Sequence, residues 1–284
     1  MKNNTKTQNA VATIRELGIF ARNHCFRRLL VFALVGVTAS LVVAKTAQAD
    51  NLTLYSTSFE QPTFQDGDQL LGLDGWSTAI PPFLNPQAAI VTNLKARDGE
   101  QSMEVHGEHL FGSEGITAPY DAVGSYRKPL NYSVSPAKFT VIVEADLLLE
   151  TNQPATPGEF FSLTIAARSG NGKTVGEIGL SSAGIVEAFA FDSPPGASPV
   201  FSQTILFNQW YHITMLLDYA GERTSYLVNG EFLGTVRTTG ASKGLERASM
   251  VVYARPNGGV DGGTGSARSN YTARFDTFRV RVSE

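Results

Sequence analysis

Three carboxylates in one apolar segment are the residues whose spacing first suggests chemistry. Residues 138–150 have the sequence KFTVIVEADLLLE, which contains Glu144, Asp146 and Glu150. Alternate residues of a strand point to the same side, so all three carboxylates would share one face. Retaining glycosidases use two carboxyl groups about 5 Å apart. Glu144 and Glu150 would lie roughly 20 Å apart at about 3.3 Å per residue, so the spacing favours a polar ligand-binding face over an acid and nucleophile pair.

Three other short motifs match the spacing of catalytic or nucleotide sites. Residues 167–174 (ARSGNGKT) approximate a phosphate-binding loop, and residues 240–244 (GASKG) match a nucleophile elbow. His106 and His109 are three positions apart in HGEH. Each corresponding site requires an adjoining helix, and none is indicated by these sequences. We therefore interpret all three as turns or surface loops, with an incidental metal site as the alternative for the histidines.

The elements that would position these residues are short strands. Residues 210–219 alternate between two faces, and Asn229-Gly230 favours a type I′ hairpin because both residues tolerate positive φ. No long 3.6-residue periodicity is visible in residues 50–284, so the pattern predicts an all-β sandwich. The expected strands are Leu52–Phe59, Ala88–Thr92, Ser102–His106, Ser125–Tyr132, Lys138–Glu150, Phe160–Arg168, Thr174–Ser181, Ile185–Phe191, Trp210–Tyr219, Thr224–Val228, Glu231–Val236, Ala248–Arg255 and Ala273–Val282.

Residues 210–236 resemble the closing half of a laminin-G-like domain of the concanavalin A-like lectin/glucanase superfamily. The resemblance rests on Trp210 opening a strand, Asp218 near its end, and Asn229-Gly230 after the next strand. Ser58-Phe59-Glu60 followed by a glycine-rich loop and Gly75-Trp76 is similar to the opening of secreted jelly-roll proteins. The resemblance implies two curved antiparallel sheets in a jelly roll. It indicates fold more strongly than activity, because many functions share this sandwich.

The same resemblance implies one catalytic and one metal-binding arrangement. Laminarinase-type glucanases of the superfamily carry Glu-x-Asp followed two or three positions later by Glu. Here Glu144 and Asp146 match, but Glu150 comes four positions after Asp146. In many such jelly rolls the first and last strands pair, and a structural calcium joins an acid from each. Glu60 and Asp276 are the residues that would bind calcium by this resemblance, with two solvated acids as the alternative.

The first 49 residues have the features of a secretory signal peptide. A basic segment precedes the apolar run Leu29–Val43, and Ala47-Gln48-Ala49 supplies a cleavage pattern. We expect cleavage after Ala49, leaving residues 50–284 as one laminin-G-like jelly-roll domain. The protein would then be secreted, periplasmic or extracellular, without stable membrane insertion. An uncleaved anchor is the alternative, although the apolar run is shorter than the roughly 20 residues of a spanning helix.

Composition narrows the chemistry of the predicted mature chain. Cys25 is the only cysteine and lies in the signal segment, so residues 50–284 contain neither a disulfide nor a thiol nucleophile. Removing residues 1–49 takes seven of the 23 basic and one of the 26 acidic residues, leaving 16 and 25. The resulting net charge of −9 argues against nucleic acid and strongly anionic polymers as partners.

These observations favour a non-catalytic, exported β-sandwich that binds a glycan or a cell-surface or matrix component. A glycoside hydrolase or polysaccharide lyase is the alternative from another class, and a structural extracellular protein is the third. The residues expected to line a concave ligand-binding face are Glu144, Asp146, Arg168, Tyr253 and Arg255.

Overall fold

The computed structural model describes most of the region predicted to be mature. The described residues are 52–78, 88–107, 122–133, 140–152, 159–193, 198–241, 244–255 and 270–283. The predicted signal segment, residues 1–49, lies outside them, as do His109, Ser242 and the whole glycine-rich segment 256–269. Among the described residues, no helix has the length and apolarity needed to cross a bilayer.

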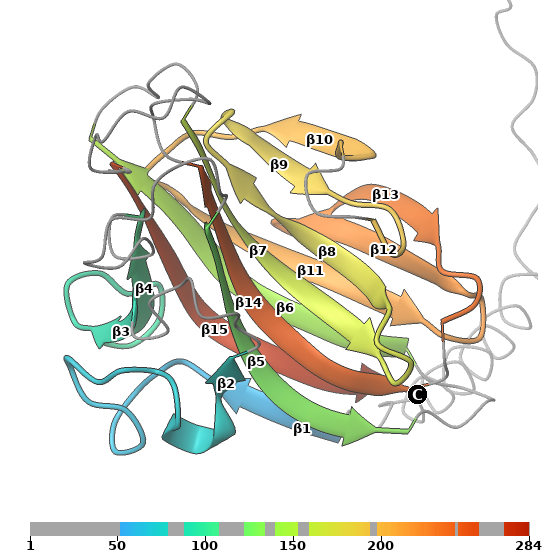
Figure 1. Cartoon of the computed structure of the whole chain (residues 1–284), viewed down its shortest axis with the longest axis horizontal. Helices are drawn as coiled ribbons and strands as arrows, with labels where there is room; N and C mark the ends of the chain where they lie inside the picture. Colours follow the sequence, from blue (N-terminus) through green and yellow to red (C-terminus); the bar gives the residue numbers. More distant parts are fainter. Residues whose placement is uncertain are drawn as a thin grey trace, which may run out of the picture. The chain divides into compact units, whose positions relative to one another are not determined.

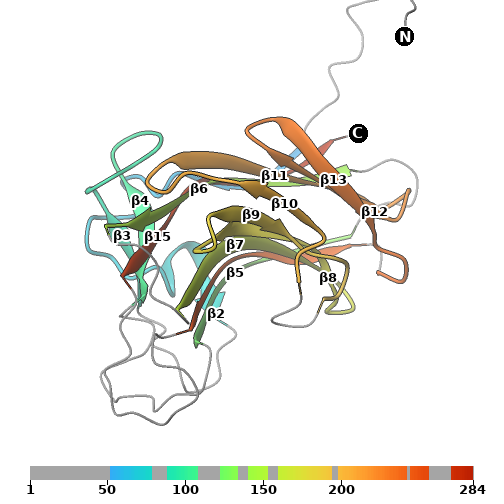
Figure 2. The same ribbon diagram turned by 90° about the horizontal axis from the view of Figure 1, so that it is seen from above.

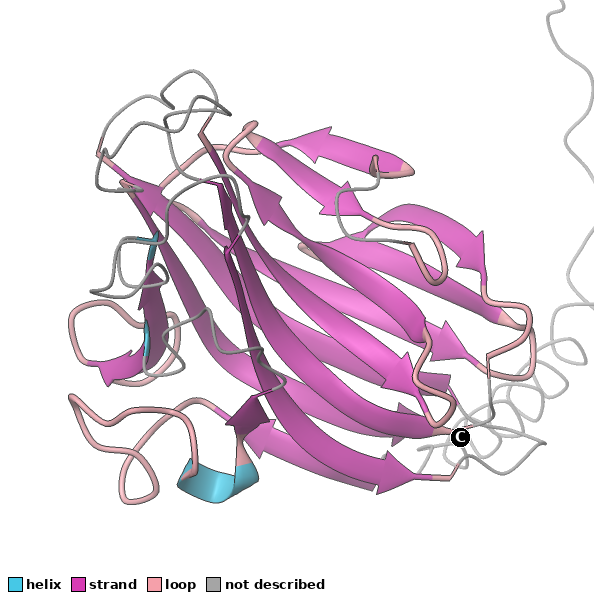
Figure 3. Ribbon diagram, viewed as in Figure 1, coloured by secondary structure: helices cyan, strands magenta, loops and turns pink. Residues whose placement is uncertain are grey.

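The described chain folds as an all-β jelly-roll sandwich of two antiparallel sheets (Figures 1 and 3). A 3-10 turn, η1 (Leu73–Gly75), is its short helical element. The eight-stranded sheet contains, in spatial order, β13 (Glu231–Arg237), β12 (Arg223–Val228), β11 (Trp210–Asp218), β6 (Thr140–Thr151), β15 (Tyr271–Ser283), β4 (Ser102–His106) and β3 (Ala89–Thr92), with β1 (Leu52–Thr57) also on β15. The seven-stranded sheet contains β10 (Phe201–Thr204), β9 (Ile185–Ala188), β8 (Thr174–Ser181), β7 (Phe160–Ser169), β14 (Leu245–Arg255), β5 (Ala122–Tyr132) and β2 (Ser77–Thr78).

The core between the sheets follows from the alternation of apolar residues. The inward residues of β6 and β11 are fully or almost fully buried, which confirms the predicted faces of both strands. They are Val141, Val143, Ala145, Leu147, Leu149, Ile213, Met215 and Leu217. Each large aliphatic side chain so buried contributes about 1.5–3 kcal/mol. The outward residues of the same strands are polar in part, and they carry the charged groups discussed below.

The outward faces of the two sheets differ in the direction of their backbone curvature. Figure 2 shows the strands arching in one sense, with the seven-stranded sheet on the inner side of the arch. We call the outward side of the seven-stranded sheet the concave face and that of the eight-stranded sheet the convex face. Inward residues of β7 and β14, such as Leu163 and Val252, are buried in the core. Residues next to them in sequence therefore project from the concave face.

The C-terminal strand contains a bulge that the simple alternation of residues 273–282 does not predict. Ala273 and Phe275 point inward, but beyond the bulge the inward residues are Phe278 and Val280. The pairing with β6 shifts register between Asp276 and Arg279, and Thr277 adopts φ 47°. One extra residue in a strand reverses the faces of those that follow. As a result Asp276 and Arg279 both lie on the convex face.

Strand β10 is an element that the sequence pattern does not predict. It is only four residues long, and Ser202, Gln203 and Thr204 are polar and exposed at the edge of the seven-stranded sheet. The Phe201 ring packs where Gly234 of β13 has no side chain, and a Cβ at Gly234 would come within 2.6 Å of that ring. The strand is therefore held by a contact between the edges of the two sheets rather than by its own alternation.

The terminal strands and the predicted hairpin are both confirmed. β1 pairs with β15, as expected of first and last strands. Asn229 and Gly230 have φ values of 52° and 82°, as a type I′ turn requires. The Asn229 side chain accepts a hydrogen bond of 2.9 Å from the His212 amide, which ties the turn to β11.

Gly230→Val should destabilise the fold through this turn. A Cβ at Gly230 would meet no atom within 4 Å, so the cost comes from the positive φ alone. We expect the free energy of unfolding to fall by about 1–3 kcal/mol. Gly230→Asn is the matched control and should cost less, because Asn tolerates this conformation. An unchanged denaturation midpoint for the valine variant would contradict the assigned turn.

Candidate functional site

The residues predicted to line one ligand-binding face are divided between the two sheets. Glu144 and Asp146 lie on β6 and point out from the convex face. Arg168 lies on β7, while Tyr253 and Arg255 lie on β14 of the seven-stranded sheet. The side chain of Arg255 is outside the description, although its backbone pairs with Phe160. The five residues therefore do not form a single site, because strand alternation assigns a face but not a sheet.

The carboxylates of Glu144 and Asp146 are occupied by ion pairs on the convex face. Glu144 lies 3.5 Å from Arg279 and 3.3 Å from Arg281. Asp146 Oδ1 lies 3.1 Å from Nδ1 of His212, directly across on β11. The hydrogen bond to Asp146 raises the pKa of His212, although burial opposes the shift. Both carboxylates are buried, and buried charges are retained in folded proteins when they are paired in this way.

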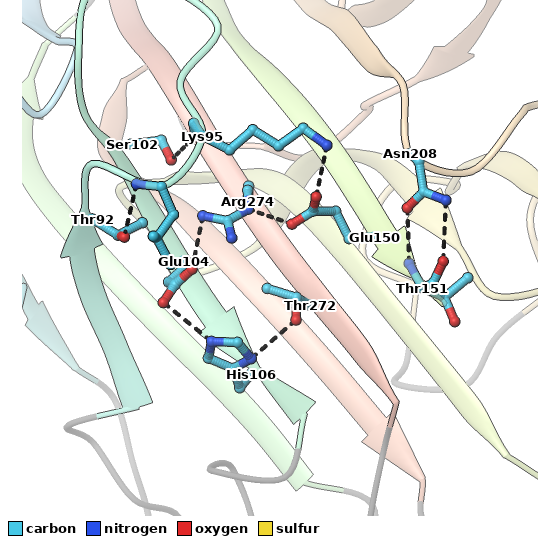
Figure 4. Close-up of polar contacts among 11 residues, drawn as sticks. Thr92, Lys95, Ser102, Glu104, His106, Glu150, Thr151, Asn208, Thr272 and Arg274 are labelled. Carbon is cyan, nitrogen blue, oxygen red and sulfur yellow. Dashed lines mark hydrogen bonds and ion pairs between the residues drawn. The ribbon is translucent and has the colours of Figure 1, made fainter. Parts of the chain in front are cut away.

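A second ion-pair group surrounds Arg274 on the same face (Figure 4). The Arg274 guanidinium lies 2.7 Å from Glu104 and also bonds Glu150, which in turn lies 2.7 Å from Lys95. Burial opposes ionisation of Glu150, but the hydrogen bonds from Lys95 and Arg274 outweigh it and lower the pKa. Glu144, Asp146 and Glu150 do share one outward face of β6, as their spacing predicts. Their cations hold them as structural pairs.

The three short motifs are found mainly in turns and strand ends. His106 ends β4, where its imidazole lies 3.1 Å from Glu104 and 3.0 Å from Thr272 (Figure 4). Residues 169–174 connect β7 to β8 as a hairpin turn, which confirms the interpretation of the phosphate-loop pattern. The described part of residues 240–244 likewise contains no helix.

The acids predicted to bind calcium both hold the loop before β4. Glu60 Oε1 accepts hydrogen bonds from the amides of Glu100 and Gln101, at 2.9 and 2.8 Å. Asp276 Oδ2 accepts from the amides of Arg97 and Asp98, at 2.7 and 2.9 Å. A cation would have to share these oxygens with N–H donors, which calcium sites built from oxygen ligands do not require. Calcium binding at this pair stays a prediction.

Burial of Asp276 has a consequence for its charge. Loss of water raises its pKa to about 6, although the amide hydrogen bonds oppose the shift and the charge of Asp146 adds to it. Within the described ranges, no cluster of three or more His, Cys, Asp or Glu residues has the geometry of a metal site. The loop is therefore fastened to β15 by a carboxylate in a poorly solvated position.

The concave face carries a hydrogen-bonded polar group at its centre. Glu177 Oε1 on β8 accepts from the hydroxyls of Tyr253, at 3.0 Å, and Thr164, at 3.1 Å. Thr164 lies on β7, between the strands of the other two residues. Burial raises the pKa of Glu177, and the two hydroxyl donors oppose that shift. Of the residues predicted from sequence, Tyr253 belongs to this group, while Arg168 interacts electrostatically with Glu177.

A second carboxylate, Glu187, lies on the neighbouring strand of the concave face. It pairs across β8–β9 with Gly179, two positions from Glu177, and burial raises its pKa. A Cβ at Gly179 would come within 1.9 Å of the Leu163 carbonyl oxygen, so this position excludes a side chain. The backbone of β7 therefore packs closely against β8 at Gly179, and Glu187 lies beside this contact.

Sequence reasoning did not identify Glu177, Glu187 or Thr164. Each is a polar residue within a predicted strand of apolar and small neighbours, which is the available signal. That signal does not predict which polar residues contact one another, because the residues lie on three different strands and their proximity depends on how those strands pair. Glu177 and Tyr253 are 76 positions apart in the chain.

Comparisons with solved structures agree with the jelly-roll fold. An endo-1,3-beta-glucanase from Streptomyces sioyaensis is similar with a TM-score of 0.51 and 14% identity, over 84% of this chain and 99% of that chain. A carbohydrate esterase from the Shiga toxin-encoding bacteriophage phi24B is similar with a TM-score of 0.51 and 10% identity, over 82% and 100% of the two chains. No protein-family model matches the sequence, and no curated protein matches it. Both neighbours support a two-sheet antiparallel jelly-roll sandwich, and identities this low show fold alone.

The contribution of His212 to stability should depend on pH. Its pKa is higher in the folded protein, chiefly through the hydrogen bond to Asp146. The stabilisation is therefore fully present below the unfolded pKa of about 6.5, and it is lost as the pH rises through the folded pKa. His212→Gln should destabilise the protein more at pH 6 than at pH 8.5 in denaturant unfolding.

Arg223→Gln is the control for the His212 variant. Its partner Asp218, at 2.9 Å, has a lowered pKa, so this pair stays ionised at both pH values. An equal loss of stability at pH 6 and pH 8.5 for His212→Gln would contradict the assigned His212–Asp146 interaction.

Proposed function

We propose that the protein binds a polysaccharide through the concave face, at the group formed by Glu177, Tyr253 and Thr164. The observation that carries this proposal is the difference between the two faces. On the convex face, Glu144 and Glu150 are held by arginine and lysine side chains. On the concave face, Glu177 bonds two neutral hydroxyls, of which the buried Thr164 orients Glu177 and the part-exposed Tyr253 retains oxygen lone pairs for a ligand.

The chemistry of this group suits a sugar. Carbohydrate hydroxyls donate and accept hydrogen bonds, and ligand sites combine concave shape with a few fixed polar groups. Tyr253 also offers an aromatic ring, and its hydroxyl is already oriented by Glu177. The concave face runs across several long strands, and a surface of that extent suits an extended chain more than a compact molecule. The names of the two structural neighbours, a glucanase and a carbohydrate esterase, are consistent with a sugar ligand by fold analogy.

The setting of this function is also proposed from the sequence. Export directed by residues 1–49 would place the protein where extracellular or periplasmic polysaccharide is present. We also propose that the domain is laminin-G-like. We propose in addition that Glu60 and Asp276 bind a structural calcium ion.

Replacing Tyr253 with Phe should weaken glycan binding without unfolding the protein. The variant loses a hydroxyl that orients Glu177 and can accept from a sugar, and one hydrogen bond is worth about 1 kcal/mol, or about fivefold in affinity. A glycan array would first identify the ligand, and titration calorimetry would then compare the variants. Tyr211→Phe is the matched control, because that hydroxyl accepts one hydrogen bond of 2.8 Å from Leu206, beside the other sheet. Equal affinity for wild type and Tyr253→Phe would count against the concave site.

Hydrolysis of the bound glycan is a second candidate function, favoured by the pair Glu177 and Glu187. Both have raised pKa values, burial being the main cause, and the charge of Glu187 adds to the shift of Glu177. A general acid in glycoside hydrolysis needs a raised pKa and a second carboxyl group about 5–10 Å away. Diagonal neighbours on adjacent strands lie roughly 7–8 Å apart, which is compatible with that requirement.

If the protein is a hydrolase, release of reducing sugar should be lost in Glu177→Gln. The amide cannot donate the proton that a general acid supplies, so the rate should fall at least about 100-fold. Glu150→Gln makes the same replacement on the convex face and should retain activity. Wild-type protein that binds a glycan without releasing reducing sugar would leave binding as the function.

A further inference from the structure

Three arginines lie together at one end of the concave face. Arg247 on β14 pairs directly with Arg168 on β7, and Arg127 on β5 pairs with Ser249, two positions from Arg247. Each arginine is adjacent in sequence to a buried core residue, Ala248, Ala167 or Tyr126. All three guanidinium groups therefore project from the concave face on adjacent strands.

Their charges are incompletely neutralised by the acids nearby. A bulge at Glu246 places its carboxylate beside Arg247, which it bonds, and Glu177 interacts with Arg168. Two carboxylates thus face three guanidinium groups. Among the described residues, the Arg127 guanidinium has no hydrogen bond or ion pair. Burial and the charges of Arg247 and Arg168 together lower the pKa of Arg127 to about 10, although the charge of Glu246 opposes the shift.

A second observation is one unused hydrogen-bond donor in the same group. The Nε atom of Arg247 is buried without a hydrogen-bond partner. A buried donor without an acceptor and like charges on adjacent strands both cost free energy. Nothing within the described core requires three arginines at this position. An anion bound between them would supply the missing acceptor and relieve the repulsion.

We propose that this arginine group binds an acidic substituent, a carboxylate or a sulfate, on the polysaccharide that occupies the concave face. The inference rests on the proposed function and adds the class of ligand: an acidic polysaccharide rather than a neutral one. Guanidinium groups match the planar, two-oxygen geometry of carboxylates and sulfates. Register places Glu177 opposite Ala166, which pairs with Ser249 next to Arg127. Sugar hydroxyls at Glu177 and an acidic group at the arginines would therefore belong to one ligand.

This inference differs from the expectation drawn from net charge. The net negative charge of the predicted mature chain argues against strongly anionic ligands, but net charge describes the whole molecule rather than one site. Charges more than about 8–10 Å apart are screened at physiological salt, so a ligand at the arginine group experiences mainly these three cations and the two neighbouring carboxylates, which together carry a net positive charge. The local excess of positive charge then decides which sugars bind.

Titration calorimetry with three hexasaccharides of equal length would test the inference on the full exported protein. The probes are a 1,4-linked oligouronate, a sulfated oligosaccharide and a neutral β-1,3-glucan oligomer. We expect an acidic probe to bind at least about tenfold more tightly than the neutral one, with affinity falling as salt increases. The stronger of the two acidic probes distinguishes carboxylate from sulfate.

Arg127→Gln is the decisive variant, because its guanidinium has no described partner and its removal relieves repulsion. It should retain or raise the melting temperature, weaken the acidic probe by about tenfold, and leave the neutral probe unchanged. Arg127→Lys keeps the charge and should recover part of the loss. Arg237→Gln, an exposed arginine of the other sheet, should change neither affinity.

The outcomes separate the inference from the proposed function. Equal or tighter binding of the neutral probe to wild type, or an equal loss for both probes in Arg127→Gln, would overturn the acidic-ligand inference and leave glycan binding intact. Absence of binding to all three probes would overturn both. A loss of acidic binding in Arg127→Gln with an unchanged melting temperature would support the inference without confusion from unfolding.

Discussion

The architecture depends on burial of the inward faces of β6 and β15 against the seven-stranded sheet. β6 pairs with β11 on one side and β15 on the other, so its inward row of five apolar residues is surrounded by partners. Because β6 lies between β11 and β15, the carboxylates in its outward row lie close to side chains of both neighbouring strands. Those carboxylates are poorly solvated, and uncompensated charge in such a position is costly. Arginines of β15 and His212 of β11 meet that requirement.

The two outward faces consequently have different capacities for binding. On the convex face, carboxylates and cations satisfy one another, and removing one member leaves a buried charge unpaired. On the concave face, Glu177 bonds neutral hydroxyls, and the nearby arginines exceed their acidic partners. Groups with unbalanced charge can interact with a ligand, whereas ion-paired groups stabilise the fold. This difference, rather than the number of polar residues, distinguishes the candidate site.

The sequence predicts the fold well because alternation and turn chemistry are local properties. The faces of β6 and β11 and the hairpin at Asn229-Gly230 follow from neighbouring residues alone. Sheet membership is not local, which is why Glu144 and Tyr253 were expected on one face and lie on different sheets. Simple alternation also does not predict bulges. The bulge of β15 is nevertheless visible in the sequence, because the spacing of inward apolar residues changes from two to three between Phe275 and Phe278. The Glu177 group is likewise not predicted from sequence, because its members are brought together only by the register of β7, β8 and β14.

The most direct measurement is a crystal structure of the protein with the tightest-binding oligosaccharide from the array. The account predicts sugar density on the concave face, with hydroxyls within hydrogen-bond distance of Glu177 and Tyr253, across β7, β8 and β14. Density on the convex face beside Glu144 and His212, or at the sandwich rim without contact to β7 or β14, would contradict it.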